Sequence, residues 1–419
     1  MAPSNTMTTA MSTDATSEAA KYKPKWTVMI FMGADTVAGS EPLVDAVKND
    51  LEEIRSVVVT KTLEIFVQVH RSAGGTRRHR FYLDPETQKA TESEMEIPTL
   101  EGGQALVDFI ASSVEQSGHR RDDHSMLVLW GHAYDFAFGR TRTRSGVVDA
   151  IDFVELSGTL QRLQDVMKER YRKAYGDQDD LRPTLDIVAF DVCDVATVEM
   201  ACQLQPYAKY LLGSEIGVPI PGWPYDRILA RLADPKDRLM TPDEFGSWAI
   251  RRFCEEYPAS SPVSLSFLDL SQATDLRARA ELLALALSVA IGNPDTRARI
   301  SELFIRSQTA ENRPYVDVAD LCLNLVRESG DVLVAETARA LGDLLLSPRV
   351  HRKGSASRPP FIVDHGRNAG ELARMNGVSL YAPHVAVGDH DAVRGLYDEF
   401  VFAQNTVWST LVYRLANSD

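Results

Sequence analysis

The sequence predicts an α/β fold in which a mostly parallel sheet is flanked by helices on both faces and followed by a mostly helical C-terminal subdomain. Apolar runs without alternation are typical of strands buried on both faces. Four such runs cover residues 26–32, 63–69, 125–130 and 185–190. Helical patterns separate these runs, and strands that alternate with helices indicate a parallel sheet. Beyond about residue 235 helical patterns predominate.

The elements of the N-terminal half follow one another in a regular order. The strand at residues 26–32 ends at Gly33. The strand at residues 63–69 is closed by the Gly74-Gly75 turn, and a polar hairpin arm follows over residues 77–83. The expected helices of this half carry apolar residues at helical spacing. They cover residues 41–58, 102–117, 151–171 and 195–204.

The C-terminal part has a different pattern of elements: it is mostly helical, with two short extended segments at residues 263–268 and 377–381. The expected helices cover residues 242–257, 271–291, 295–306, 316–327 and 334–346. We therefore expect three parts: a disordered leader over residues 1–24, an α/β domain over residues 25–235, and a mostly helical subdomain over residues 236–419.

The composition indicates a globular protein with an acidic balance of charge. Hydrophobic residues make up 44% and charged residues 25% of the 419 residues, and the formal net charge is -14. A nucleic-acid groove requires clustered lysine and arginine instead. No stretch approaches the roughly 20 apolar residues of a membrane span. We therefore expect neither nucleic acid nor a membrane among the partners.

The leader and the cysteines favour a cytoplasmic location. The first 20 residues are rich in Ser, Thr, Ala and Met, without the basic start and apolar core of a secretory signal. The four cysteines include no Cys-x-x-Cys pair and no Cys/His cluster, which argues against a structural zinc site. Four cysteines in so long a chain also argue against a disulfide framework. We expect a reducing compartment, in which a thiol stays free for chemistry.

Two reactive residues follow buried strands at their carboxyl ends, where the reactive groups of parallel sheets gather. His132 follows the strand at residues 125–130 after Gly131, and Cys193 follows the strand at residues 185–190. The helix expected from residue 195 would bring its positive dipole end and unpaired N–H groups to the thiol. Both favour the thiolate, which is the nucleophilic form.

Each of these residues also has an ordinary structural interpretation. A lone histidine often caps a loop, and a free cysteine is most often a buried core residue. Together they form a stronger signal, because a histidine upstream of a cysteine is the order found in caspases. Cys202, Cys254 and Cys322 fit the structural interpretation better, since they fall within helical patterns.

Several motifs resemble those of the clostripain family of cysteine peptidases, which is related to caspases, gingipains and legumain. The family's Trp-x-His signature is matched by Trp130-Gly131-His132, and its Phe-Asp-x-Cys signature by Phe190-Asp191-Val192-Cys193. A Ser-Glu pair followed by Gly-Trp-x-Tyr is matched at Ser214-Glu215 and at residues 222–225. The resemblance covers roughly residues 25–415, and it implies a caspase-like fold with the catalytic domain over residues 25–235.

The resemblance implies a role for each matching residue. Cys193 would be the nucleophile, and His132 would protonate the leaving amine. The backbone N–H groups of Cys193 and Ala133 would bind the oxyanion. The implied S1 pocket comprises Asp191, Ser214 and Trp223. With Asp191 on its floor it would select Arg, and also Lys, at P1 of protein or peptide substrates. The implied function is a cysteine endopeptidase that cleaves after basic residues.

The chain departs from the family pattern at three points of the site, one of which is Val192, where the family carries a small residue before the cysteine. Ala133-Tyr134-Asp135 replaces a glycine-rich run after the histidine, and Pro221 stands where the family carries a second acidic residue. Basic specificity therefore rests on Asp191 alone. The altered loop also leaves open a pseudoprotease, a fold kept for binding partners after the chemistry was lost.

The resemblance also suggests a zymogen, because family members are often processed between the histidine and the cysteine. Three arginines alternate with small polar residues in a loop expected over residues 139–146; they are Arg140, Arg142 and Arg144. The enzyme could cut itself there, or an activating protease could cut it. An ordinary solvated basic loop has the same composition.

Motifs for other chemistries give weaker alternatives. A nucleotide-binding α/β module is disfavoured, because the chain has neither a P-loop nor a GxGxxG turn. No cofactor is expected. Calcium is the one metal considered, at Asp35, Asp135 and Asp194, although these residues lack the regular ligand spacing of a calcium loop.

Overall fold

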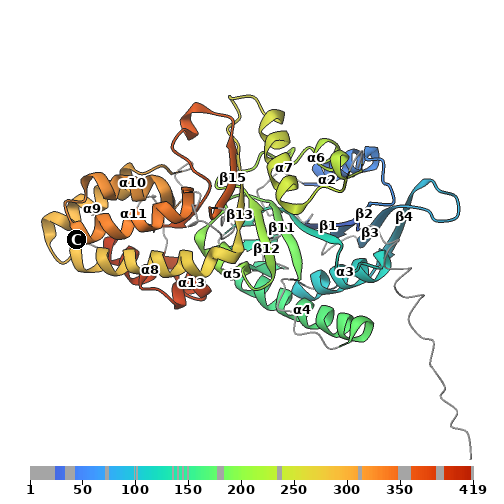
Figure 1. Ribbon diagram of the computed structural model, residues 1–419, viewed down its shortest axis with the longest axis horizontal. Helices are drawn as coiled ribbons and strands as arrows, with labels where there is room; N and C mark the ends of the chain where they lie inside the picture. Colours follow the sequence, from blue (N-terminus) through green and yellow to red (C-terminus); the bar gives the residue numbers. More distant parts are fainter. Residues whose placement is uncertain are drawn as a thin grey trace, which may run out of the picture.

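The structure is a computed structural model (Figure 1). It describes residues 24–33, 43–70, 75–98, 100, 102–134, 136–138, 141–143, 146–148, 151–176, 184–233, 238–309, 314–347, 360–383 and 391–416. Apart from residue 24, the expected leader lies outside the described residues.

A nine-stranded sheet forms the centre of the molecule, in the order β15-β13-β12-β11-β5-β1-β2-β3-β4. Its strands are β1 Trp26–Gly33, β2 Leu63–His70, β3 Thr76–Leu83, β4 Ala90–Ile97, β5 His124–Gly131, β11 Leu185–Asp191, β12 Ala208–Gly213, β13 Ser264–Asp269 and β15 Ile362–Arg367. The strands from β12 through β11, β5 and β1 to β2 are parallel, and the outer strands are antiparallel. The parallel strands therefore end at one common edge.

Helices cover both faces of the sheet, which confirms the predicted fold class (Figure 1). Alternate residues of each parallel strand enter different cores. On one face, Val28 and Ile30 of β1 pack beneath α2 Val44–Ser56, α6 Tyr225–Ala233 and α7 Pro242–Glu256. On the other face, Met29 and Phe31 pack against α3 Gly102–Ser117, α4 Phe153–Tyr175 and α5 Val198–Leu204.

The C-terminal part is mostly helical and extends from the sheet on the left of Figure 1. Its helices are α8 Ala273–Ala290, α9 Pro294–Arg306, α10 Val318–Glu328, α11 Val332–Leu346, α12 Asp391–Tyr397, α13 Val401–Gln404 and α14 Trp408–Ala416, with short 3-10 turns at Leu270–Gln272 and Gly370–Leu372. Strands β14 Tyr315–Asp317 and β16 Ser379–Tyr381 pair with each other. Because β13 and β15 belong to the central sheet, this part of the chain also completes the sheet. The division at residue 235 stays a prediction.

Three strands of the sheet were not predicted from the sequence, and each has a physical reason. Strand β4 lies at the edge and is mostly exposed, so it carries no apolar pattern. Strands β12 and β15 are only six residues long, and β15 contains charged side chains and a glycine. The helix expected from residue 195 begins at Val198 instead.

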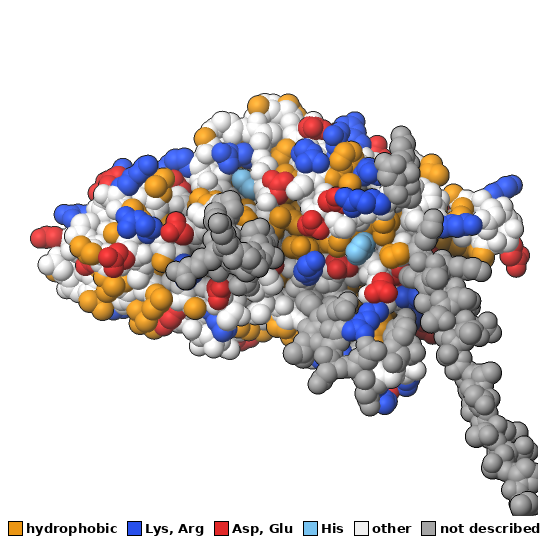
Figure 2. Space-filling model, in the orientation of Figure 1, with side chains coloured by type: hydrophobic (Ala, Val, Ile, Leu, Met, Phe, Trp, Pro, Cys, Tyr) orange, Lys and Arg blue, Asp and Glu red, His pale blue; other side chains and the backbone are white. Residues whose placement is uncertain are grey.

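The surface carries both signs of charge. Basic and acidic side chains are interspersed over the face seen in Figure 2. Among the helices that the structure describes, none combines the length and the apolar character needed to cross a membrane.

Candidate active site

His132 and Cys193 follow two adjacent strands at the same edge of the sheet. Strands β5 and β11 are parallel neighbours, and Trp130 is the register partner of Asp191. His132 and Cys193 each stand two residues beyond that pair. The sequence-predicted pair therefore leaves the sheet from equivalent positions of neighbouring strands.

Gly131 determines how the chain leaves β5 toward His132. Its φ is 144°, and an added Cβ would lie 2.9 Å from the carbonyl oxygen of Gly33. Only glycine fits this close backbone approach without strain. His132 itself is half-buried, and burial lowers its pKa below the ordinary value of 6.5. At neutral pH the ring is therefore uncharged and able to take up a proton.

Cys193 is partly exposed and forms no disulfide, and its thiol lies against a loop. The backbone N–H of Val218 donates to its Sγ at 3.2 Å. The helix-dipole prediction for Cys193 is wrong: α5 begins at Val198, and the Thr197 side chain caps it by accepting from the N–H of Met200 at 3.2 Å. A hydrogen bond donated to sulfur favours the thiolate. The Cys193 thiol also lies 3.9 Å from the carbonyl of Val218, to which it can donate.

The backbone directly after Cys193 has an unusual conformation. Asp194 has a φ of 56°, in the left-handed region that few residues other than glycine and Asn or Asp adopt. Its N–H donates to the carbonyl of Ile216 at 3.2 Å. Such conformations persist only where the surroundings enforce them, and they gather at functional sites.

Ser214 enforces this conformation from the end of β12. Its carbonyl accepts hydrogen bonds from the N–H groups of Val195 and Ala196, both at 2.9 Å. Its hydroxyl accepts from the N–H of Ile216 at 3.1 Å. Ser214 is fully buried. The structure therefore shows a supporting contact for Ser214, and a direct contact with the P1 side chain stays a prediction.

Glu215 fastens the same loop to the C-terminal part of the chain. Its carboxyl accepts from the N–H of Gly377 at 2.7 Å and from the hydroxyl of Ser379 at 2.9 Å. Burial and the nearby charge of Asp317 raise the pKa of Glu215 well above 4.5. The loop that ends at Val218, beside the Cys193 thiol, is thus anchored on β16.

Asp191 ends β11 in a closed polar environment. Its Oδ2 accepts from the N–H of Trp223 at 3.0 Å and from the hydroxyl of Tyr225 at 3.1 Å. An added Cβ on Gly222, whose φ is 66°, would lie 2.8 Å from the same oxygen. Burial raises the pKa of Asp191 to about 7, although these two hydrogen bonds oppose the shift. A dry carboxyl group of this kind is suited to binding a cation.

The remaining sequence-predicted residues lie nearby or outside the described part. Trp223 contacts Asp191 through its backbone, and its side chain lies in the core. Ala133 begins the short strand β6 Ala133–Tyr134, which pairs with β7 Ala137–Phe138; β10 Ile151–Asp152 completes this small sheet. Of the residues considered for calcium, Asp194 is described, and Asp35 and Asp135 lie outside the described residues.

The expected loop with three arginines contains a hairpin. Arg142 lies in β8 Thr141–Thr143, which is antiparallel to β9 Gly146–Val148 with Arg142 opposite Val147. Arg140 and Arg144 lie outside the described residues. The expectation of a loop is therefore wrong at Arg142, because backbone pairing holds Thr141–Thr143 in a strand.

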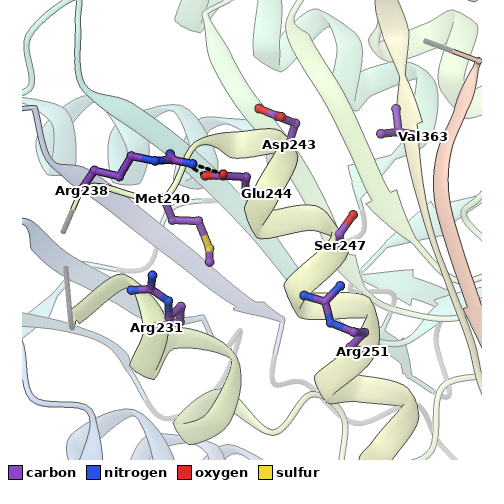
Figure 3. Close-up of a pocket in the computed structure, with 8 residues that line it drawn as sticks. All are labelled: Arg231, Arg238, Met240, Asp243, Glu244, Ser247, Arg251 and Val363. Atoms are coloured by element: carbon purple, nitrogen blue, oxygen red, sulfur yellow. Dashed lines mark hydrogen bonds and ion pairs between the residues drawn. The ribbon is translucent and has the colours of Figure 1, made fainter. Parts of the chain in front are cut away.

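A pocket of about 540 Å³ lies away from these residues (Figure 3). Helices α6 and α7 and strand β15 supply most of its lining, which comprises Arg231, Arg238, Met240, Asp243, Glu244, Ser247, Arg251 and Val363. The carbonyl of Met240 accepts a hydrogen bond from the Trp26 ring at the amino end of β1. The pocket therefore lies near the opposite edge of the sheet from His132 and Cys193, and within it Arg238 is paired with Glu244.

One group in the described part has the side chains for a metal ion: His79, Glu92 and Glu94 on β3 and β4, whose ligand atoms lie within 4.8 Å of one another. Arg55 holds Glu92 through two hydrogen bonds of 2.9 and 3.0 Å. Arg77 pairs with Glu94 at 2.6 Å. These guanidinium groups already neutralise the carboxylates, so the cluster is satisfied as an ion-pair network.

The comparisons with known proteins point to one group of enzymes. A family model described as the clostripain family matches residues 36–340. The fold matches a secreted C11 cysteine protease from Bacteroides thetaiotaomicron, with a TM-score of 0.60, 12% identity, and coverage of 92% of this chain and 99% of that chain. It also matches an inactive zymogen C11 protease from Parabacteroides distasonis, with a TM-score of 0.56, 14% identity, and coverage of 92% and 99%.

A third solved structure extends this likeness of fold. It is a secreted C11 cysteine protease from Bacteroides thetaiotaomicron in complex with an irreversible peptide inhibitor, with a TM-score of 0.57 and 16% identity. The match covers 94% of this chain and 100% of that chain. A search of curated protein sequences found no match.

Proposed function

Because the chain belongs to the clostripain family and is a cysteine peptidase, we propose that it is an endopeptidase that cleaves after basic residues through Cys193 and His132. The observation that carries this proposal is the placement of both residues two positions beyond a register pair of adjacent parallel strands, with the buried carboxyl of Asp191 beside them. The P1 side chain and the scissile carbonyl can then be held at one edge of the sheet.

The proposed reaction follows from these positions. His132 takes the proton of the Cys193 thiol, and the resulting thiolate attacks the scissile carbonyl carbon. The oxyanion is bound by the backbone N–H groups of Cys193 and Ala133. His132 donates a proton to the leaving amine as the carbon–nitrogen bond breaks, which leaves a thioester. His132 then takes a proton from water, whose oxygen attacks the thioester. The acid product leaves, and the thiol is restored.

Substrate selection is assigned to Asp191. A guanidinium or ammonium group at P1 would pair with its carboxylate, and that charge-assisted bond is strong in a water-poor site. Trp223 and Tyr225 hold Asp191 through one oxygen, Oδ2. The other oxygen, Oδ1, is buried and has no hydrogen-bond partner in the described part of the chain. Ser214 supports the neighbouring loop.

We further propose that the chain is a zymogen activated by cleavage after Arg140, Arg142 or Arg144. These residues lie between His132 and Cys193 in the sequence, so a cut there would leave both halves of the sheet intact. One of the solved proteins of similar fold is described as an inactive zymogen. The cut can be made by the enzyme itself or by an activating protease.

A cytoplasmic location is proposed as well. Its support is that none of the four cysteines, Cys193, Cys202, Cys254 and Cys322, forms a disulfide, as expected in a reducing compartment. We also propose that the enzyme is active without calcium. Activity should then be unchanged when a calcium chelator is added to the peptide assays described below.

Hydrolysis of fluorogenic peptides with Arg, Lys, Asp or Ala at P1 tests the main proposal. The wild-type protein should hydrolyse the Arg and Lys substrates, and the Cys193→Ala variant should hydrolyse none. No turnover above that variant, before or after cleavage near Arg144, would overturn the proposal. Mass spectrometry of the two purified proteins tests maturation: a cut after Arg140, Arg142 or Arg144 that is absent from the variant supports self-processing.

A further inference from the structure

Helix α2 carries a carboxyl group where its sequence pattern requires an apolar side chain. Its buried residues recur at helical spacing, and they are Ala46, Val47, Asp50, Leu51 and Ile54. Asp50 is 1% exposed, as deeply buried as its apolar neighbours. Burial of a carboxyl group away from water is unfavourable unless the group is paired. Packing alone therefore does not explain Asp50.

Asp50 lies over the face of the sheet toward which the Asp191 side chain points. Trp130 and Asp191 are register partners in adjacent parallel strands, so their side chains point to the same face. Helix α2 covers that face, and the Trp130 ring donates a hydrogen bond to Asp50. Burial, followed by the charge of Asp191, raises the pKa of Asp50 to about 9.

Glu53 of α2 is connected to Asp191 through Tyr225. It lies one turn after Asp50 on α2, and its carboxyl accepts from the N–H of Tyr225 at 2.9 Å. The hydroxyl of the same tyrosine donates to Asp191 at 3.1 Å. Burial raises the pKa of Tyr257, and the charges of Asp191, Asp50 and Glu53 raise it further. The hydroxyl of Tyr257 donates to the carbonyl of Gly222 at 2.6 Å. Three acidic groups from two elements thus surround one small region.

Neither buried aspartate has a cation beside it in the part of the chain that the structure describes. Oδ2 of Asp50 and Oδ1 of Asp191 are buried there without a hydrogen-bond partner. Two buried carboxyl groups that disfavour each other's ionised form would both gain from a cation that reaches them.

We propose that Asp50 and Asp191 together bind the P1 side chain and that this pair selects arginine over lysine; the inference rests on the proposed cleavage after basic residues. A guanidinium group presents five N–H donors in a planar fork, so it can bridge carboxyl groups that come from α2 and β11. An ammonium group is a compact point charge and pairs fully with only one of them. Asp50 is therefore a specificity residue of the S1 pocket.

Steady-state kinetics on matched peptides that differ only in P1 test this inference. The P1 residues are arginine, lysine and citrulline, the last being the uncharged counterpart of arginine. Wild type is compared with Asp50→Asn, which keeps the side-chain shape, and with Asp191→Asn. Glu52→Gln is the matched control, because Glu52 is an exposed acid of the same helix. A thermal melt of each variant shows that it is folded.

Wild type should prefer arginine to lysine. Asp50→Asn should lower kcat/KM for arginine about 10- to 100-fold, mainly through KM, as expected when one charged hydrogen bond is lost. The kcat/KM of Asp50→Asn for the lysine substrate should stay within about threefold of wild type, so the preference for arginine over lysine is lost. Glu52→Gln should change kcat/KM for neither substrate. An unchanged arginine-to-lysine ratio in folded Asp50→Asn, or a wild-type preference for lysine, overturns the inference and leaves cleavage after basic residues intact. Equal cleavage of arginine and citrulline by wild type overturns the proposed function itself, and no cleavage at all overturns both.

Discussion

Replacing Asp50 by asparagine should make the stability of the protein less dependent on pH. Burial and the charges of Asp191 and Glu53 raise the pKa of Asp50 from 3.8 to about 9 in the folded protein. A carboxyl with a raised folded-state pKa holds its proton more tightly in the folded chain than in the unfolded chain. Its contribution to stability is therefore complete below pH 3.8 and is lost as the pH rises toward 9.

The magnitude follows from proton linkage. Between pH 5 and pH 8 the folded protein binds one more proton at Asp50 than the unfolded chain does. The free energy of unfolding then falls by about 1.4 kcal/mol per pH unit from this group, or about 4 kcal/mol over three units. Asparagine does not titrate, so the free energy of unfolding of the variant does not fall with pH through this position.

Urea unfolding at pH 5, 6, 7 and 8 measures the effect, with Cys193→Ala present in both proteins to prevent self-cleavage. Between pH 5 and pH 8, the free energy of unfolding of the Asp50→Asn variant should rise by about 4 kcal/mol relative to that of its parent. Other titrating groups are common to both proteins and largely cancel. Glu52→Gln, on the exposed side of α2, should show no such trend. A difference between Asp50→Asn and its parent that is constant with pH would refute the argument that Asp50 is buried with a proton.

Three further substitutions have clear expected outcomes. Gly131→Ala should lower the melting temperature and reduce kcat/KM at least about 10-fold, because the new Cβ meets a backbone carbonyl and strains the chain before His132; wild-type activity would contradict this. Cys202→Ala should keep activity and the rate of alkylation by iodoacetamide, since burial raises the pKa of that thiol to about 12; slower alkylation would show that Cys202 is reactive. Thr197→Ala should reduce the free energy of unfolding by about 1 kcal/mol through loss of the α5 cap, as urea unfolding would measure; an unchanged value would show that the cap contributes nothing.

The sequence was sufficient to predict the parallel centre of the fold. Strands β1, β2, β5 and β11 are buried on both faces, so their apolar runs are unambiguous. The strands that were missed have weaker local signals, because β4 is exposed at the edge and β15 is charged. Their positions are determined by pairing with strands distant in sequence, which a local pattern does not contain.

The site was predictable where it lies at strand ends. His132, Cys193 and Asp191 follow directly from the ends of β5 and β11. The loop donor Val218 was missed, because its contact with Cys193 joins residues 25 positions apart. Asp50 was missed although it left a signal: an acidic residue at a buried position of the α2 pattern. Its contribution depends on how α2 packs over the sheet.

Covalent labelling shows directly whether Cys193 is the catalytic nucleophile. The protein is treated with a peptidyl acyloxymethyl ketone that carries arginine at P1, and the modified peptide is identified by mass spectrometry. One adduct is expected, on Cys193, and its formation should be slowed by His132→Ala and abolished by Cys193→Ala. No adduct in the folded protein, before or after cleavage near Arg144, or an adduct on Cys202, Cys254 or Cys322 instead, would contradict it.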